Sequence, residues 1–350
     1  MVEGQRRASG RLGWIDEARA LGACVIVLLH VLVSTSLAME LDLQRQVVYT
    51  VVEIIVCRWA VPAFFAVSGA LMLDPQHEMG WNRVLVHVRR MLVTILIFGT
   101  VFATMEEVWV RLREGMAIGP SIVLFVLRDL LTMQTWDHLW FVYAMAGVYL
   151  FVPAMRWIRQ RFGERGHLVM TGASFTLFLV IPTLMGGAPS AGPISSFFWN
   201  VAAGIACYCV GGCLASWRLS PAWVAVGVGS VIIMVVMSIS GIGSGQGDRS
   251  FLFMQGSCFS CLYAVLVLML LRHFVGEAPL DPESIMTGLA KDSFGVYLIH
   301  PLFIHLGLMV IRPEGMVPVL YEVIFACVVA IASVGATRAL RHVPVVNTIL

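Results

Sequence analysis

Charged residues are scarce in this sequence, and their scarcity excludes a soluble globular fold. Only 13% of the 350 residues are charged, whereas an ordinary globular domain carries roughly 25%. Hydrophobic residues make up 59% of the chain, and the mean hydropathy is +0.87. A soluble fold could not bury so much apolar surface, so we predict a polytopic membrane protein. The formal net charge of +2 indicates no particular partner, and we expect no nucleic-acid binding.

The sequence also lacks a disulfide framework and a metal-binding pattern. All eight cysteines fall in apolar runs, where the Cys258–Cys261 pair is typical of small-residue helix packing rather than of zinc. The histidines are scattered singly, without metal-ligand spacing, so we expect no metal. The sequence shows no soluble domain, low-complexity tail or internal repeat, and we predict one membrane-embedded domain over residues 1–350.

Ten apolar runs are long enough to cross a bilayer, which needs about 20 residues per helix. The first run follows a basic stretch, but it is long for a signal peptide and is interrupted by His30, so we expect it to be retained. The predicted fold class is therefore all-α, with about ten transmembrane helices. The runs cover residues 18–39, 47–73, 91–110, 138–157, 168–185, 197–216, 221–240, 251–271, 293–311 and 318–340.

Arginines in alternate linkers orient the predicted bundle. They gather at the N-terminus, between the second and third spans, between the fourth and fifth, and near the C-terminus. With ten spans all of these lie on one side, and the positive-inside rule then puts both termini in the cytoplasm. The longest linker on the other side, residues 111–137, contains the amphipathic stretch SIVLFVLRDLLTM, which we expect to lie along the outer face.

Ionisable side chains at membrane depth are costly and usually functional, so those inside the predicted spans are the leading site candidates. The first span carries Arg19 at its cytoplasmic end and His30 near mid-membrane, with Asp16 one turn before Arg19. At about 100° per residue, Arg19 and His30 lie within roughly 20° of the same helix face, about 16 Å apart. The other candidates are Arg58, Glu106, Asp137, His138, Trp140, His300 and His305.

Structural roles are open for several of these residues. Arg19 could mark the cytoplasmic boundary, and His138 with Trp140 could belong to an interfacial belt. His30 could join two helices by a hydrogen bond, and we interpret His305 as packing rather than chemistry. No span carries repeated arginines, which argues against a voltage sensor. Close helix packing is indicated in the sixth span by small residues at a spacing of four: Ala203, Cys207, Gly211 and Ala215.

Four stretches of the chain carry a resemblance to a known family. The opening WIDEARALGACVIVLLHV has an Asp-x-x-Arg turn followed by Arg-x10-His, and CRWAVPAFFAVSGALML, HLWFVYAMAGVYLFVP and SFGVYLIHPLFI follow in order. These stretches resemble the first, second, fourth and late segments of the acyltransferase family 3 membrane proteins. Within the family, the chain is most similar to the short, stand-alone polysaccharide O-acetyltransferases, such as that for enterobacterial common antigen.

The resemblance implies a membrane-bound O-acyltransferase of the bacterial inner membrane. Such an enzyme transfers an acyl group, expected to be acetyl from acetyl-CoA or a related acyl-CoA donor, to a hydroxyl. The implied acceptor is a surface polysaccharide or a lipid-linked sugar, and the surrounding partner is membrane lipid. A sugar hydroxyl needs a base, so His30 is the predicted base or, alternatively, carries the acyl group itself.

The resemblance also suggests roles for the remaining candidates. Arginine binds phosphate through a planar fork, so Arg19, with Arg89 or Arg90, is predicted to hold the CoA phosphates. Arg58 and His138 are predicted to polarise the thioester carbonyl or to hold the acceptor. The predicted supporting residues are Asp16, which would orient Arg19, and Trp140, Glu106 and His300.

Two other functions would also place polar residues at membrane depth. A transporter or flippase for a glycan or small solute predicts inverted repeats with broken helices, which the sequence does not show, and no affinity for CoA. A structural subunit of a polysaccharide export complex predicts that His30 is dispensable.

Overall fold

The computed structural model describes residues 12–350, except for residues 40, 76–79, 137, 188–191, 245–249, 255 and 311–318. The described part of the chain is a bundle of helices without a strand, which confirms the all-α class. Its elements, with π-helical or 3-10 turns marked η, are α2 (Gly13–Ala38), α3 (Leu43–Val52), η2 (Glu53–Cys57), α4 (Ala60–Met72), α5 (Trp81–Thr94), η3 (Ile95–Gly99), α6 (Thr100–Glu114), α7 (Ser121–Thr132), α8 (Trp140–Phe175), η4 (Thr176–Val180), α9 (Ile181–Leu184), α10 (Pro193–Cys213), α11 (Pro221–Ser244), η5 (Ser250–Leu252), α12 (Cys258–Val275), α13 (Ile285–Val310), α14 (Leu320–Leu340) and α15 (Pro344–Asn347).

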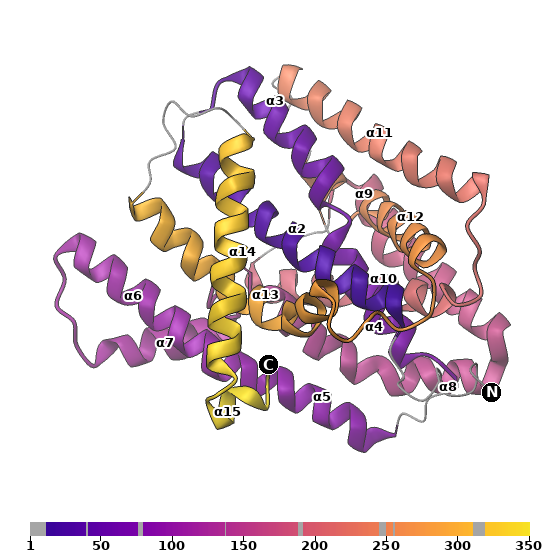
Figure 1. Ribbon diagram of the computed structural model, residues 1–350, viewed down its shortest axis with the longest axis horizontal. Helices are drawn as coiled ribbons and strands as arrows, with labels where there is room; N and C mark the ends of the chain where they lie inside the picture. Colours follow the sequence, from indigo (N-terminus) through magenta and orange to yellow (C-terminus); the bar gives the residue numbers. More distant parts are fainter. Residues whose placement is uncertain are drawn as a thin grey trace.

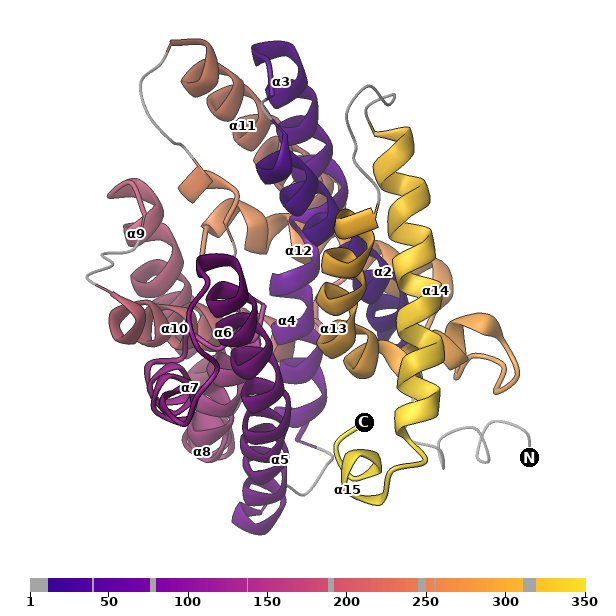
Figure 2. The same ribbon diagram turned by 90° about the vertical axis from the view of Figure 1, so that its left-hand side faces the viewer.

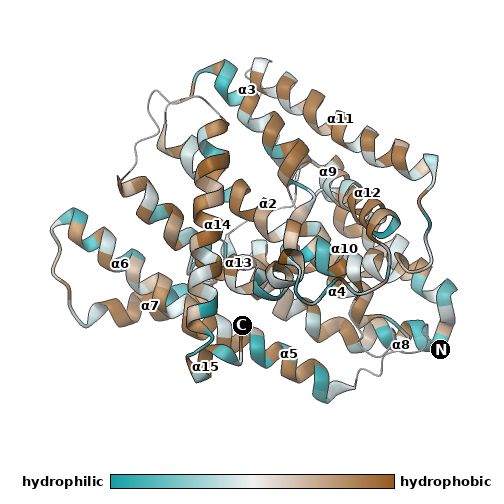
Figure 3. Cartoon of the chain, in the orientation of Figure 1, coloured by the Kyte–Doolittle hydropathy of each residue, from teal (hydrophilic) through white to brown (hydrophobic). Residues whose placement is uncertain are grey.

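The first helix of the bundle, α2, lies at its centre, where it packs on α4, α12, α13 and α14 (Figure 1). The helices α11 and α14 lie on the outside, and their outer faces are covered by hydrophobic residues (Figure 3). Ile331 on α14, for example, is 74% exposed. A surface of this kind is stable against lipid rather than against water, so the chain is a multi-pass membrane protein.

Nine helical stretches among the described residues are long and apolar enough to cross a membrane. The longest, Trp140–Leu184, has 45 residues and joins two spans that the sequence predicts separately. Gly163 interrupts it with φ 64° and ψ −161°, a conformation that glycine adopts almost alone.

The two arms on either side of Gly163 form a hairpin against α10. Met155 Sδ lies 3.7 Å from Cys209 Sγ, and Thr171 Oγ1 lies 3.4 Å from the Cys209 carbonyl oxygen. Residues eight positions before and after Gly163 are therefore at the same level of α10. Counting the two arms separately gives ten candidate spans among the described residues, which agrees with the predicted number.

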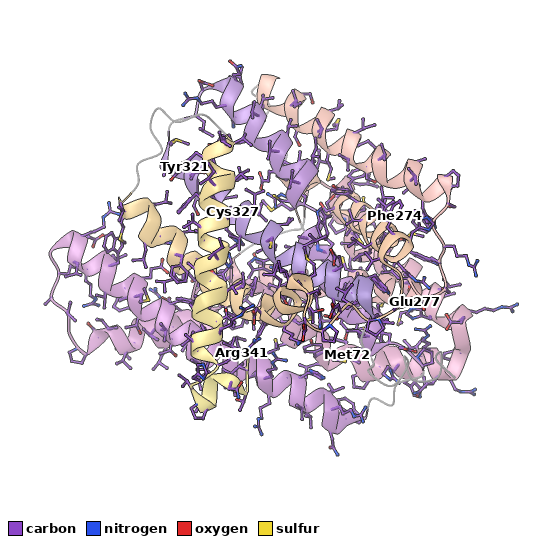
Figure 4. The ribbon with its side chains drawn as sticks, in the orientation of Figure 1. Met72, Phe274, Glu277, Tyr321, Cys327 and Arg341 are labelled. Atoms are coloured by element: carbon purple, nitrogen blue, oxygen red, sulfur yellow. The ribbon has the colours of Figure 1, made fainter. Side chains whose placement is uncertain are left out.

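Arginines tie several helix ends together at one end of the bundle, which we call the arginine-rich end. Arg156 Nη1 donates to the Met72 carbonyl at the end of α4 (2.6 Å). Arg341 Nη2, after the end of α14, donates to the Lys291 carbonyl near the start of α13 (2.7 Å). Figure 4 shows Arg341 at one end of α14 and Tyr321 at the other. The described helix ends that the predicted alternation places together thus meet at one end. The N-terminal arginines lie outside the described residues, and the cytoplasmic orientation stays a prediction.

The start of α2 lies at the same end. Trp14 N donates to the Gly276 carbonyl, 3.2 Å away, in the connection between α12 and α13. Because α2 and α13 both begin at the arginine-rich end and pack on each other, they run parallel. Residues a similar distance into the two helices therefore lie at similar depth.

Glycines allow α4 and α10 to pack with their backbones in contact. A Cβ atom on Gly211 would lie 1.9 Å from the Ala66 carbonyl oxygen, and one on Gly69 would lie 2.0 Å from the Tyr208 carbonyl oxygen. The predicted close packing of the sixth span is confirmed.

The third span begins ten residues before its predicted start, because α5 continues through the arginines that the apolar run excluded. The helix starts at Trp81 and leads through η3 into α6 (Figure 2). The amphipathic linker stretch forms α7, which packs on α6 and buries Val126, while Leu124 and Leu131 are exposed.

Candidate active site

A cavity of about 720 Å³ lies between α2, α4, α8 and α13. Six of the residues predicted from the sequence as site residues line it: Arg19, His30, Arg58, Arg90, His138 and Trp140. They come from helices that are distant in sequence, so the fold brings together what the sequence could only list.

Cations line one end of this cavity, which we call the basic end. Arg19 is near Arg90 on α5, and both are close enough to Tyr149 on α8 to interact electrostatically. Lys291, at the start of α13, also lines the cavity. The C-terminal residues reach the same place, because Arg90 Nε donates to the Ile349 carbonyl oxygen (2.7 Å). The basic end is therefore suited to binding an anionic ligand group.

His30 lies on α2 at about 16 Å of helical rise from Arg19. Its Nδ1 atom is 3.0 Å from the Ile26 carbonyl oxygen and 3.1 Å from Nε2 of His300 on α13. A carbonyl oxygen can only accept a hydrogen bond, so the Nδ1 atom of His30 carries the hydrogen. The lone pair of the neutral ring is then on Nε2.

His300 lies behind His30 and does not line the cavity. It is fully buried, and its Nδ1 atom is 3.1 Å from the Val296 carbonyl oxygen. The contact between His30 and His300 joins α2 to α13, so the helix-joining role considered for His30 is realised alongside its position in the cavity wall.

His138 lies in the turn before α8, outside the candidate membrane spans, and is 2% exposed. Burial, followed by the neighbouring His30, lowers the pKa of His138 to about 3, so its ring is neutral at pH 7. Its Nε2–H donates to the Leu298 carbonyl oxygen (3.2 Å), and the Tyr297 hydroxyl donates to the His138 carbonyl oxygen. The neutral ring has no further N–H to offer a ligand.

Arg58 follows the π-helical turn η2 and lines the cavity away from the basic end. Single π-helical turns inside long helices frequently occur at functional sites. The Arg58 guanidinium forms an ion pair with Glu53 and lies over the Phe253 ring, 4.8 Å from its centroid. Trp136 and His305, whose rings are 4.9 Å apart, line this second region, which we call the far end.

Other predicted residues lie outside the cavity wall. Asp16 is buried on α2, one turn before Arg19. Arg89 and Glu106 are exposed and do not contribute to the lining of this cavity. Asp137 lies outside the described residues.

Several cavity residues were not singled out from the sequence as part of the site. Lys291 lies just before the apolar run 293–311 and gives no site signal in the sequence. Tyr297 belongs to the SFGVYLIHPLFI motif, and its position three residues before His300 places it near the same helix face. Tyr149 and Trp136 offered no signal, because aromatic residues are frequent throughout the chain. His305, interpreted as packing, contacts Trp136 and also lines the cavity.

Comparison with known proteins gives one match. A family model described as an acyltransferase domain matches residues 12–338, nearly the whole chain. No curated protein and no solved structure matches the chain.

Proposed function

The chain belongs to this acyltransferase family, and on that premise we propose that it transfers an acetyl group from acetyl-CoA to a sugar hydroxyl of a cell-surface glycan or its lipid-linked precursor. The proposed location is the bacterial inner membrane, with the arginine-rich end in the cytoplasm. The observation that supports this most strongly is that one cavity is lined both by the cations of the basic end and by His30.

The basic end is the proposed binding site for the phosphates of the donor. Arg19 and Arg90 supply planar guanidinium groups that match phosphate oxygens in pairs, and Lys291 adds a compact charge. Arg90 is also held over the Phe294 ring, 5.2 Å from its centroid, which orients its guanidinium. These cations lie where a cytoplasmic donor would arrive if the predicted orientation is right.

The reaction centre is proposed to be His30. Its Nε2 atom takes the proton of the acceptor hydroxyl as the oxygen forms a bond to the thioester carbonyl carbon. When the carbon–sulfur bond breaks, His30 returns that proton to the departing sulfur, so the products are an O-ester and the free thiol of CoA. The separation of about 16 Å between Arg19 and His30 allows one extended donor to reach both groups.

The far end is proposed to bind the acceptor. Arg58 is the cation there, and its N–H groups can donate to sugar hydroxyls or polarise the thioester carbonyl. The only N–H of the neutral His138 ring donates to the Leu298 carbonyl oxygen. The proposed contribution of His138 is therefore to shape the cavity beside His30. Trp136 and Trp140 provide the apolar surfaces on which a sugar ring can rest.

The test uses the full-length protein in lipid nanodiscs, with acetyl-CoA as the donor. Binding is measured by calorimetric titration with CoA, and turnover is measured as release of CoA thiol. Wild type, Arg19→Ala and His30→Ala are compared, and thermal unfolding confirms that each variant is folded. We expect Arg19→Ala to weaken CoA binding and His30→Ala to bind CoA normally while losing turnover by roughly 10²- to 10⁴-fold.

The alternatives predict different results. A transporter or flippase without CoA chemistry would not bind CoA, even as the wild-type protein. The lack of an acceptor in the assay could explain a lack of turnover, but it could not explain a lack of CoA binding. A structural subunit would keep its cellular function after His30→Ala. Either outcome would contradict the acyltransferase mechanism proposed for this cavity.

A further inference from the structure

The contact between His30 and His300 has a fixed direction. The Val296 carbonyl can only accept, so Nδ1 of His300 carries its hydrogen and Nε2 of the neutral ring is an acceptor. The Ile26 carbonyl likewise requires a hydrogen on Nδ1 of His30. The two constraints agree: the single Nδ1–H of His30 is shared between the Ile26 carbonyl oxygen (3.0 Å) and the Nε2 atom of His300 (3.1 Å), so His30 is the donor and His300 an acceptor.

We propose that His300 is a positioning residue for the transfer reaction, because it accepts the Nδ1–H of His30 and stabilises the imidazolium that His30 becomes. This inference rests on the proposed function, in which Nε2 of His30 is the base. A neutral histidine would then occupy the place that a carboxylate holds behind the histidine of many hydrolases. His300 would act through His30, since it does not line the cavity.

The bond is expected to strengthen during the reaction. Before proton transfer it joins two neutral rings, but once His30 Nε2 is protonated the donor is a cation, and charge-assisted hydrogen bonds are about twice as strong as neutral ones. The interaction is therefore larger in the transition state than in the ground state, which is the condition for raising kcat. His300 is fully buried, so water does not compete for its lone pair.

The chain contains a matched control for this role. His167 on α8 is fully buried, as His300 is. It lies beside Gly212, where a Cβ atom would be 2.7 Å from its Nε2 atom, and it does not line the cavity. Replacing each histidine in turn separates the bond to His30 from the general effect of removing a buried histidine.

The experiment compares His300→Leu, His300→Gln and His167→Leu in nanodiscs. We expect His300→Leu to lower the rate of thiol release roughly 10- to 100-fold, as loss of an outer partner does at histidine sites, with CoA binding unchanged. His300→Gln should recover part of that rate, because its side-chain oxygen can accept the same hydrogen. His167→Leu should leave the rate per folded molecule within about twofold of wild type, because His167 is outside the cavity and a substitution away from the reacting groups has a small effect.

A spectroscopic readout keeps the proposal testable if His300→Leu does not fold. In wild-type protein labelled with ¹⁵N in its histidine rings, and assigned by comparison with His30→Gln, we expect Nδ1 of His30 to be protonated and Nε2 of His300 to be unprotonated. The opposite assignment would overturn the proposal. So would equal losses of rate in His300→Leu and His167→Leu.

The outcomes separate this inference from the proposed function. If wild type fails to bind CoA, or if His30→Ala keeps full turnover, the proposed function fails and the positioning role fails with it. If His30→Ala is inactive but His300→Leu turns over at the wild-type rate, only the positioning role fails.

Discussion

Arg89 and Arg90 are neighbours in sequence, yet the structure separates them, and replacing each by alanine should give different results. Arg90 lines the basic end of the cavity, while Arg89 is exposed outside it. We expect Arg90→Ala to weaken binding of CoA and Arg89→Ala to leave it unchanged.

The expected magnitude follows from the contacts of Arg90. A hydrogen bond from a charged donor to phosphate contributes about 1.5–3 kcal/mol. Arg90 can keep its Nε–H on the Ile349 carbonyl oxygen, 2.7 Å away, and bind phosphate through its Nη groups. The loss on truncation is then about 1.5–3 kcal/mol, or roughly 10- to 160-fold in Kd. The Kd of Arg90→Lys for CoA should lie between those of wild type and Arg90→Ala, because an ammonium group keeps the charge but lacks the planar fork of a guanidinium.

The assay is calorimetric titration of CoA into the three variants and wild type in nanodiscs, at two salt concentrations. Part of the Arg90 contribution is screened by salt, so the difference between wild type and Arg90→Ala should shrink as salt rises. Equal effects of Arg89→Ala and Arg90→Ala, or a larger effect at Arg89, would refute the placement of the donor phosphates at the basic end.

Three further predictions concern stability and pH. Gly211→Ala should lower the free energy of unfolding by about 1–3 kcal/mol through overpacking. Gly229→Ala should leave it unchanged, because its Cβ atom would have no neighbour within 4 Å. Thermal unfolding of both variants in the same detergent checks this prediction. Asp292→Asn removes the charge that pairs with Arg338 and Arg341, whose side chains are 61% and 27% exposed. Because water can solvate both arginines, on the order of 1 kcal/mol of stability should be lost, and a Tm equal to wild type would show that these pairs contribute nothing measurable. Because burial lowers the pKa of His138 to about 3, the unfolded chain binds a proton below its ordinary pKa of about 6.5 and the folded chain does not, so acid destabilises the fold. Between pH 6.5 and 5 this amounts to about 1.5–2 kcal/mol, and the fall in Tm over that range should be smaller in His138→Leu; an unchanged slope would contradict the neutral buried state.

The membrane fold could be read from the sequence because its signals are local. An apolar run of sufficient length predicts a helix, and alternating arginine-rich linkers predict which helix ends meet. The ends of the helices were harder to predict from the sequence, because α5 continues through charged residues that a hydropathy criterion excludes. Gly163 gave no signal as a turn, although it is the residue at which α8 reverses.

The candidate site was only partly predictable, because it depends on tertiary packing. His30 and Arg19 could be paired from helical periodicity, and the structure places both in the cavity wall. The bond between His30 and His300 joins residues 270 positions apart, and nothing in the spacing indicates it. Arg89 and Arg90 differ by about 100° around one helix, so only the packing of α5 decides which of them faces the cavity.

The most direct test of the central claim is an experimental structure of the protein in nanodiscs with CoA bound. We predict phosphate groups within hydrogen-bonding distance of Arg19 and Arg90 at the basic end, and the thiol within reach of Nε2 of His30. A structure with CoA bound elsewhere, or with its thiol directed away from His30, would contradict the account.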